Sequence, residues 1–580
     1  MTFDEVFTRL GRADLDLEQR LLATVEATVE ALALPMRDAL EAAAVPHSFN
    51  ALVLAHLLDV DNAQAETLTA ELATLSFVEK FPLRGGWNVH KVVRSAVRLK
   101  LNRETPERFR LLSARAAQCS YGDDTVNRVE AIYHGLSSDP RNTVAELERT
   151  YVAWDRAGLL EAQHMLATVL EELRTFPVEK TAKARAMTFL GWIRLHRYPL
   201  DKSEGLAREA IQSLTAAGEP VALADAHLLL GRVLERRGKV KEALKEFRDG
   251  RKLLSEAIRS DPASFEVGRV LADAHIFIGR LCKRGKGGRE ALAEYAEAQR
   301  ILNGMIARDP DNPVWKRELS VTHSDVGRIY QEQKDFRSAL GSFQADRKIA
   351  EELAAADPSN PDKKVDLGVS YNNTGRLFMD QNMFAEALRE HQADRDIMLG
   401  LIAVDASNPD WLRELSVALL GVGDAHRALK NHAEAIESYA DCRRILQGLT
   451  EIDPGNAEWQ RDLSLADQRL GRLYREQQNF PEALAAFERS RVILERMLAQ
   501  EPDSEDWLRG LSVLLHHMGR TYEAQGDLAN ALVSYQQDLV IAERLAAMQP
   551  DDASRQKDLR DRREAVDRVH AAMPNGGRAA

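Results

Sequence analysis

The chain has 580 residues, of which 44% are hydrophobic and 29% charged, and its formal net charge is −12. This length supports several hydrophobic cores, and the acidic balance makes nucleic acid an unlikely general partner. The three cysteines lie far apart, with no disulfide or zinc spacing, and neither a signal peptide nor a bilayer-spanning apolar segment is present. We therefore expect a cytoplasmic protein that does not enter a membrane.

The N-terminal region has mixed helix and strand signals. Residues 1–34 form a helical segment, because residues 15–33 have the apolar spacing of an amphipathic helix. Residues 35–112 contain helix signals near 36–44, 50–58 and 62–75, strand-like residues at 76–81 and 87–89, and a further helix from about 90 to 101. Helices followed by a two-stranded wing predict a small winged-helix-like domain over residues 35–112.

Winged helices often bind DNA through the helix before the wing. In this chain that helix, at residues 62–75, contains Glu66 and Glu71 and no Lys or Arg. A helix that reads the major groove needs basic side chains near the phosphates, so DNA binding is the less favoured interpretation.

A second interpretation depends on a resemblance. Leu-x-x-Leu-Ser-Phe-Val-Glu-Lys at residues 72–80, a glycine turn and Trp-x-Val-His-Lys-Val-Val-Arg at residues 87–94 resemble the winged helix of STAND-type signalling NTPases. In that family the winged helix links a nucleotide-binding domain to a repeat sensor. His90 matches the histidine of the family's Met-His-Asp motif, which implies a nucleotide contact at His90. Val89 and Lys91 replace the Met and the Asp, and the sequence contains no NTPase domain, so a histidine at a helix start, packed against the wing, is the alternative.

Residues 89–110 are the most basic stretch of the chain, with seven Lys or Arg residues against two glutamates. They could contact phosphate or an acidic partner, but we favour the solvated face of two helices. Residues 113–180 have helical spacing without a regular repeat and are expected to form a connector.

The rest of the chain follows one period. Seven glycines are each 48 residues apart, at 231, 279, 327, 375, 423, 471 and 519, and registers of alanine, leucine and isoleucine keep the same step. Several registers that hold one period without an insertion indicate a solenoid over residues 181–552. Residues 553–580, which begin densely charged, are expected to form a capping helix and a tail.

Each unit has the apolar spacing of two antiparallel helices. A glycine, an aromatic residue three positions on, an alanine twelve on and a Phe or Tyr sixteen on resemble the tetratricopeptide repeat, as in Gly327, Tyr330, Ala339 and Phe343. That family's unit has 34 residues, and the 14 extra residues here predict helices of about 20 residues each. The expected fold is therefore all-α: a solenoid of long tetratricopeptide-like hairpins, preceded by the winged-helix-like domain.

The sequence contains none of the common catalytic or metal-binding motifs. His227, His275 and His323 repeat at 48 residues, but equivalent atoms of neighbouring repeats lie about 10 Å apart, too far to share one ion. We therefore expect no metal, no cofactor and no enzymatic activity, with an unrecognised active site as the least favoured class.

One row of residues is the leading binding site. Arginine follows the repeat glycine at Arg232, Arg280, Arg328, Arg376, Arg472 and Arg520, and Asp424 is the exception. In the tetratricopeptide family this position faces the concave groove, and a line of guanidinium groups suits carboxylates or phosphates. The alternative is that each arginine pairs with an acid of its own or the next repeat, such as Asp346 or Asp394.

The favoured function is a non-catalytic scaffold or sensor that binds a protein or peptide, acidic in character, in its concave groove. The resemblance to the sensor arm of STAND proteins implies stress or immune-type signalling with a separately encoded effector. The alternative is a peptide-sensing transcription regulator whose winged helix binds DNA. The oligomeric state is left open.

Overall fold

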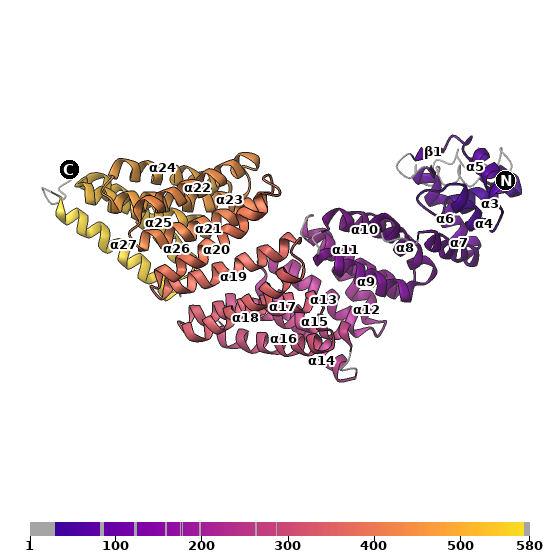
Figure 1. The fold of residues 1–580 in the computed structure, drawn as a ribbon, viewed down its shortest axis with the longest axis horizontal. Coiled ribbons are helices and arrows are strands. Elements are labelled where there is room, and N and C mark those ends of the chain that lie inside the picture. The colour runs from indigo at the N-terminus through magenta and orange to yellow at the C-terminus, as the bar shows by residue number, and fades with distance from the viewer. Residues whose placement is uncertain are drawn as a thin grey trace. The chain divides into compact units, whose positions relative to one another are not determined.

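The computed structural model describes residues 29–81, 86–120, 124–156, 159–174, 176, 178–195, 199–260, 264–285, 287–550 and 552–573. The chain divides into two compact units, Met1–Pro310 and Asp311–Ala580, which are taken separately below (Figure 1). Residues 1–28, which hold most of the expected helix at 15–33, lie outside the described residues. None of the described helices combines the length and the apolar character that a membrane span requires.

The first unit begins with a helical module that carries a two-stranded sheet. Its elements are α3 (Leu34–Ala43), α4 (Ala51–Leu58), α5 (Asn62–Leu72), β1 (Val78–Phe81), β2 (Gly86–Val89), α6 (Lys91–Glu104) and α7 (Pro106–Cys119). The strands are antiparallel, with Val78 opposite Val89. Side chains of Asn50 and Asp61 accept hydrogen bonds from the first turns of α4 and α5, which fixes where these helices begin. The order of elements is the one expected for this region, while the winged-helix assignment stays a prediction.

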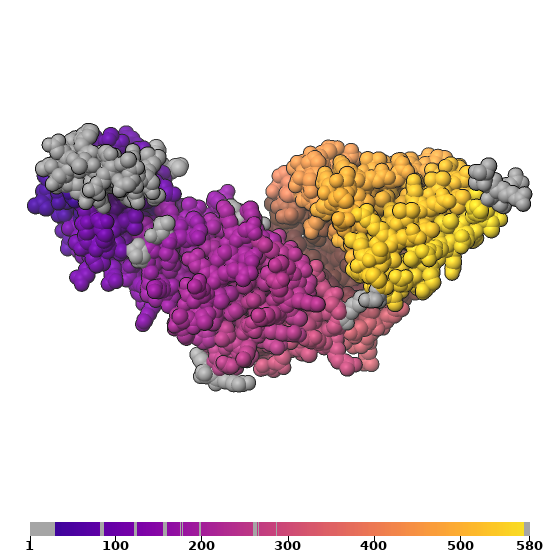
Figure 2. All heavy atoms as spheres, turned by 180° about the vertical axis from the view of Figure 1, so that it is seen from behind, coloured from indigo at the N-terminus to yellow at the C-terminus, as the bar shows by residue number. Residues whose placement is uncertain are grey.

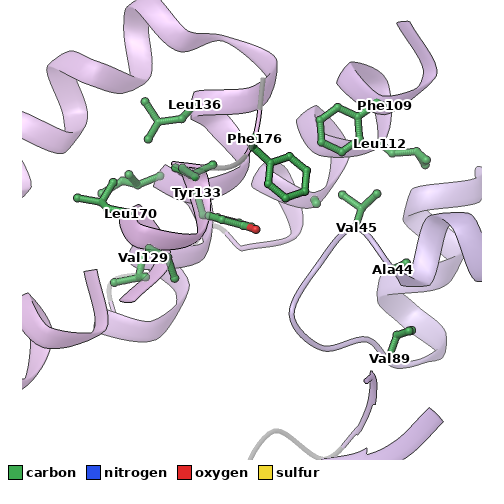
Figure 3. Close-up of a cluster of buried hydrophobic side chains, with 14 of the residues drawn as sticks. Ala44, Val45, Val89, Phe109, Leu112, Val129, Tyr133, Leu136, Leu170 and Phe176 are labelled. Atoms are coloured by element: carbon green, nitrogen blue, oxygen red, sulfur yellow. The ribbon is translucent and has the colours of Figure 1, made fainter. Parts of the chain in front are cut away.

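The core of this module continues into the helices that follow. These are α8 (Thr125–Ser138), α9 (Pro140–Arg156) and α10 (Leu160–Leu173). Val45, Phe109, Tyr133, Leu170 and Phe176 belong to one cluster of buried side chains (Figure 3). The segment before α4 therefore packs against α8, although more than 80 residues separate them in the sequence.

The basic stretch at 89–110 is a solvated face only in part, because Lys91, Arg103 and Arg110 are exposed but two of its arginines are buried. Arg94 is 7% exposed and Arg98 1% exposed. The Arg98 guanidinium contacts the Tyr133 hydroxyl and lies 4.4 Å from the centre of the Tyr133 ring and 4.5 Å from that of Phe176. Aromatic rings attract a cation, which helps this core to accept a charge that the sequence pattern places in solvent.

Helices α11 to α26 pair as consecutive antiparallel hairpins, and α27 packs alone against α26. In the first unit they are α11 (Lys180–Leu195), α12 (Leu200–Thr215), α13 (Pro220–Arg236), α14 (Val240–Ser260), α15 (Phe265–Arg284) and α16 (Gly288–Arg308). In the second unit they are α17 (Pro313–Glu332), α18 (Phe336–Ala356), α19 (Pro361–Asp380), α20 (Phe384–Ile402), α21 (Pro409–Ala428), α22 (His432–Ile452), α23 (Ala457–Glu476), α24 (Phe480–Gln500), α25 (Glu505–Gln525), α26 (Leu528–Met548) and α27 (Ala553–Ala572). Figure 2 shows the outer atoms of both units from the side opposite to Figure 1. Helices of 20 and 21 residues in α17 and α18 confirm the expected long hairpins of a tetratricopeptide-like solenoid.

The glycine and aromatic registers form one contact inside each hairpin. A Cβ atom at Gly327 of α17 would lie 2.5 Å from the Phe343 ring of α18, and one at Gly423 would lie 2.5 Å from the Tyr439 ring. Real Cβ atoms do not approach a ring so closely, so only glycine lets the two helices meet at this distance. The 48-residue period is therefore a packing period.

The turn inside each hairpin also repeats one backbone conformation. Lys334, Asn382, Lys430 and Gln478 have positive φ angles of 62°, 59°, 65° and 60°. Glycine holds the equivalent position at Gly238 and Gly526, with φ of 76° and 86°. All of these positions share the 48-residue step.

Candidate functional site

The structure divides the predicted arginine row between the two units. Arg232 lies on α13 and Arg280 on α15 of the first unit; Arg328, Arg376, Arg472 and Arg520 lie on α17, α19, α23 and α25 of the second. Each belongs to the first helix of its hairpin. The two sets are therefore separate candidate surfaces.

In the first unit Arg232 is held by its own neighbours. Its guanidinium pairs with Glu235 one turn further on and lies 5.0 Å from the centre of the Phe277 ring. Burial lowers the pKa of Arg232, Glu235 opposes this, and Arg280 adds to it. An arginine that is already paired and stacked has less to gain from a ligand, so this set is the weaker candidate.

In the second unit the row begins with two arginines in different settings. The Arg328 guanidinium donates a hydrogen bond to Asn373 at 3.4 Å and lies 3.8 Å from Asp325. Arg376 is exposed, and no carboxylate among the described residues lies within ion-pair distance of it. Arg328 thus uses part of its hydrogen-bonding capacity on Asn373 of the next repeat, whereas Arg376 faces solvent.

The alternative, pairing with an acid of the same or the next repeat, holds for Arg232 with Glu235. Among the described residues no ion pair joins the row to Asp346 or Asp394. The Asp346 carboxylate accepts a hydrogen bond from Ser320, and that of Asp394 accepts one from Asn372 at 3.1 Å. Burial raises the pKa of Asp346 to about 6 and that of Asp394 to about 7. Ion pairing with these two acids therefore does not explain the arginine row.

Arg472 and Arg520 belong to a denser group on α21, α23 and α25. We call it the arginine cluster and define it as Arg427, Arg469, Arg472, Arg475 and Arg520. Two acids bridge α21 and α23 within it: Asp424 lies 3.2 Å from Arg469, and Glu476 lies 2.9 Å from Arg427. The exception in the predicted row, Asp424, is thus a partner of the cluster.

The remaining three guanidinium groups are not neutralised. Among the described residues no carboxylate lies within ion-pair distance of Arg472, Arg475 or Arg520, and Glu523, one turn after Arg520, pairs with Arg568 at 3.0 Å. Five arginines against two carboxylates leave three positive charges over.

The pKa shifts of Arg472 and Arg475 have a common cause. Burial lowers the pKa of Arg472, and Arg469 and Arg427 lower it further; burial, Arg520 and Arg472 lower that of Arg475. Both guanidinium groups stay charged at neutral pH, because an arginine pKa starts far above it. Like charges held together favour the arrival of an anion, whose carboxylate or phosphate oxygens can accept bidentate hydrogen bonds from arginine.

His517 lies beside this cluster and cannot add to its charge. Burial, Arg472 and Arg475 lower the pKa of His517 to about 3, so the ring is neutral at pH 7. Its Nδ1 atom is buried without a hydrogen-bond partner among the described residues. The surface therefore combines fixed positive charge with a neutral polar ring.

Four of these residues were missed from the sequence: Arg427, Arg469, Arg475 and His517. A usable signal existed for two of them, because Arg427 and Arg475 are 48 residues apart and lie four residues after a repeat glycine. One helical turn separates that register from the predicted row, so both lie on the same helix face.

The other predicted site residue, His90, lies at the start of α6 and is exposed. Its backbone nitrogen donates to the Phe77 carbonyl at 2.8 Å, and its side chain has no polar partner among the described residues. The nucleotide contact stays a prediction.

Two histidines of the repeating ladder pair inside their own hairpins. Nδ1 of His227 lies 2.7 Å from Glu246, and Nδ1 of His275 lies 2.6 Å from Glu294. Each of these two rings is thus engaged with a carboxylate of the following helix.

Comparison with known proteins agrees with this architecture. Models of the tetratricopeptide repeat match residues 468–505 and 514–567, the region that carries Arg469, Arg472, Arg475 and Arg520. No curated protein matches the chain.

Solved structures of similar fold include a Signal Transduction ATPase with Numerous Domains (STAND) protein with a tetratricopeptide repeat sensor from Pyrococcus horikoshii. It shares 13% sequence identity at a TM-score of 0.52, over 86% of this chain and 69% of that one. At this identity the likeness shows the fold alone.

Two further structures are less similar. The quorum sensor NprR from B. thuringiensis has 11% identity and a TM-score of 0.43, over 69% of this chain and 97% of its own. RapI has 14% identity and a TM-score of 0.42, over 67% and 98%. Because these scores lie below 0.5, they support no conclusion about this chain.

Proposed function

We propose that this chain is a non-catalytic sensor or scaffold that binds a protein or peptide partner through the first helices of its hairpins. The observation that carries the proposal is the excess of positive charge in the arginine cluster, where three guanidinium groups have no carboxylate within ion-pair distance among the described residues. Tetratricopeptide hairpins commonly serve as binding surfaces, and Arg376 extends this surface onto α19.

The chemistry favours an acidic partner. Aspartate and glutamate side chains, or a terminal carboxylate, can accept two parallel hydrogen bonds from one guanidinium group. An extended acidic segment could meet the arginines of α21, α23 and α25 in turn. The match between repeated donors and repeated acceptors would give the site its specificity.

We further propose a signalling role, of stress or immune type, in which a separate chain supplies the effector. The similar STAND protein carries its tetratricopeptide repeats as a sensor, and we extend that role to this chain. The chain offers less support for DNA binding, because α5, the helix before the two strands, carries no Lys or Arg that could contact DNA phosphates from the major groove.

Partner capture from the source lysate, with mass spectrometry, tests the proposal. The wild-type chain is compared with Arg472→Glu/Arg475→Glu and with a matched control, Arg389→Glu/Arg496→Glu, which reverses two exposed charges on α20 and α24. We expect one protein to be retained by wild type and control and lost by the cluster variant. Equal retention by all three would show that the cluster is structural, and no specific retention would contradict the scaffold function.

Binding of a defined peptide tests whether the partner's negative charge is what the cluster recognises. A fluorescent peptide rich in Glu and Asp should bind the wild-type chain, and its Gln and Asn counterpart should not. The affinity should fall by at least about tenfold in the cluster variant, since each lost charge-assisted hydrogen bond is worth about 1.5–3 kcal/mol. An acidic peptide that binds the cluster variant as tightly as wild type would contradict the acidic-partner assignment.

A further inference from the structure

Three side chains distant in the sequence converge in the first unit. Nδ1 of His47 lies 2.9 Å from the Glu130 carboxylate, and Nε2 of His134 lies 3.3 Å from it. One nitrogen of each ring and a carboxylate oxygen all lie within 4.8 Å of one another. The sequence contains no metal-binding motif here, because 83 residues separate His47 from Glu130.

The fold builds this arrangement from two places. Glu130 and His134 are four residues apart on α8, so they share one face of that helix. His47 lies in the segment between α3 and α4, which the shared core holds against α8. Figure 3 shows the Tyr133 hydroxyl, next to this face, directed toward the part of that segment that carries Val45.

His134 is buried in a way that its protein neighbours do not explain. Its side chain is 0% exposed, and neither ring nitrogen has a hydrogen-bond partner among the described residues. Its Nε2 is within ion-pair distance of Glu130 but not in hydrogen-bonding geometry. A buried polar atom without a partner is costly, and a bound ion is one of the ways in which proteins satisfy it.

His47 is oriented as metal-binding histidines usually are. Its second nitrogen, Nε2, lies 3.3 Å from the Glu172 carboxylate. Lys91 and Arg94 lie 3.3 Å and 3.6 Å from the same carboxylate and hold its charge in place. A carboxylate behind a histidine fixes the tautomer and turns the other nitrogen toward the ion.

We propose that His47, Glu130 and His134 form a binding site for one divalent transition-metal ion, of which Zn²⁺ is the type. Ligand atoms at about 2.1 Å from a tetrahedral ion lie about 3.4 Å apart. The distance from His134 to Glu130, 3.3 Å, matches this spacing, and that from His47, 2.9 Å, has to widen by about 0.5 Å. The widest pair, at no more than 4.8 Å, has to close by about 1.4 Å at most. Two imidazoles and one carboxylate disfavour Ca²⁺ and Mg²⁺, which prefer oxygen ligands only.

The proposed site also adjoins open space. Glu130 lines a cleft of about 720 Å³ together with Phe49, Asn50 and Asn127. With three protein ligands, the fourth position of the ion is free for a water or a small molecule that enters from this cleft. The ion would join the segment before α4 to α8 and so cross-link the N-terminal module to the helices that follow.

Metal titration of the full chain, prepared without a histidine tag and treated with chelator, tests the site. We expect one equivalent of Zn²⁺ by calorimetry and, with Co²⁺, the visible absorption of a tetrahedral complex. His47→Ala should weaken binding by at least about 100-fold, because it removes one of three ligands. His275→Ala, which removes a histidine also paired with a glutamate, should bind as wild type does.

Glu130→Gln is the second variant, used if His47→Ala does not fold as judged by circular dichroism. It keeps the side-chain shape and removes the charge, so metal affinity should fall while the helical signal stays. Binding of less than a tenth of an equivalent by the wild-type chain at micromolar Zn²⁺ would overturn the proposal. Equal affinity in wild type and the folded variant would overturn it as well.

Discussion

Two arginine-rich regions show how the same side chain can have opposite surroundings. In the first unit Arg185 and Arg269 share Glu148 at 3.2 Å and 2.6 Å, and Arg185 also lies 2.9 Å from Glu266. We call these four residues the paired network. In the second unit the arginine cluster has five guanidinium groups and two carboxylates.

The pKa values of Arg269 and Arg472, one from each region, shift in opposite directions. Burial would lower the pKa of Arg269, but Glu148, Asp225 and Asp273 raise it. Burial lowers that of Arg472, and its basic neighbours add to the effect. The signs of the neighbouring charges, rather than burial itself, thus separate an arginine that stabilises the fold from one that is available to a ligand.

The largest effect is expected when the paired network is broken. Arg269→Met removes the main cation of Asp225 and leaves the buried Glu148 with Arg185 alone. Loss of one partner of a buried ion pair costs about 3–5 kcal/mol, so the free energy of unfolding should fall by that amount. Urea unfolding followed by circular dichroism measures it, with Arg300→Met, a 70% exposed arginine, as control. A loss below about 1 kcal/mol would show that the network is not structural.

Among the described residues, Asp394 is a buried carboxylate without a cation within ion-pair distance, the opposite case to the three arginines of the cluster without a carboxylate within that distance. Its replacement should have an intermediate effect on stability. Burial raises the pKa of Asp394 to about 7. The folded chain therefore keeps this proton up to about pH 7, whereas the unfolded chain releases it near pH 4. Stability should thus fall as the pH rises through that window, because the folded state binds more protons there.

Asp394→Asn removes this titration. The variant should unfold with a flatter pH dependence and be more stable than wild type at pH 8 by up to about 4 kcal/mol, because each pKa unit is worth about 1.4 kcal/mol, while the two should be similar at pH 4. Urea unfolding at pH 4, 6 and 8 tests this, and Asp405→Asn, an exposed carboxylate, serves as control. Parallel pH profiles for wild type and Asp394→Asn would contradict the shifted pKa.

The smallest effect, and one of opposite sign to that of Arg269→Met, is expected in the arginine cluster. Arg472→Met removes one of several repelling charges and keeps much of the apolar stem, so stability should stay the same or rise by up to about 1 kcal/mol. The same urea assay measures it, together with binding of the acidic peptide, which should weaken. A destabilisation as large as that of Arg269→Met would remove the distinction between the two regions.

The sequence was sufficient for the repeating part of the fold. Gly327 and Phe343 recur with the period because they contact each other in the folded hairpin. The repeated pattern in the sequence therefore reports a contact in the structure. The expected helix length near 20 residues follows from the 48-residue period, which exceeds the usual 34 residues by 14, and it is confirmed in α17 and α18. Such agreement is possible because each hairpin depends mainly on its own residues and those of its neighbours.

Contacts between side chains that are distant in the sequence and are not set by the repeat could not be predicted in this way. Arg98 looks like a solvent-facing cation in the sequence, and only the fold reveals that Tyr133 and Phe176 enclose it. The separation into two units falls at Pro310, where the residues resemble the other repeat junctions. Arg475 and His517 meet because α23 and α25 are adjacent, which the repeat period does not encode for individual side chains.

The left-handed residue in the hairpin turns determines how the energetic cost of these turns is distributed along the array. A residue other than glycine loses about 1–2 kcal/mol in this conformation, and Lys334, Asn382, Lys430 and Gln478 each do so at the same place. These four turns therefore carry a similar penalty, and none of the four is singled out as the weakest. Gly238 and Gly526 avoid the penalty, so the α13–α14 and α25–α26 hairpins make the same turn at a lower local cost.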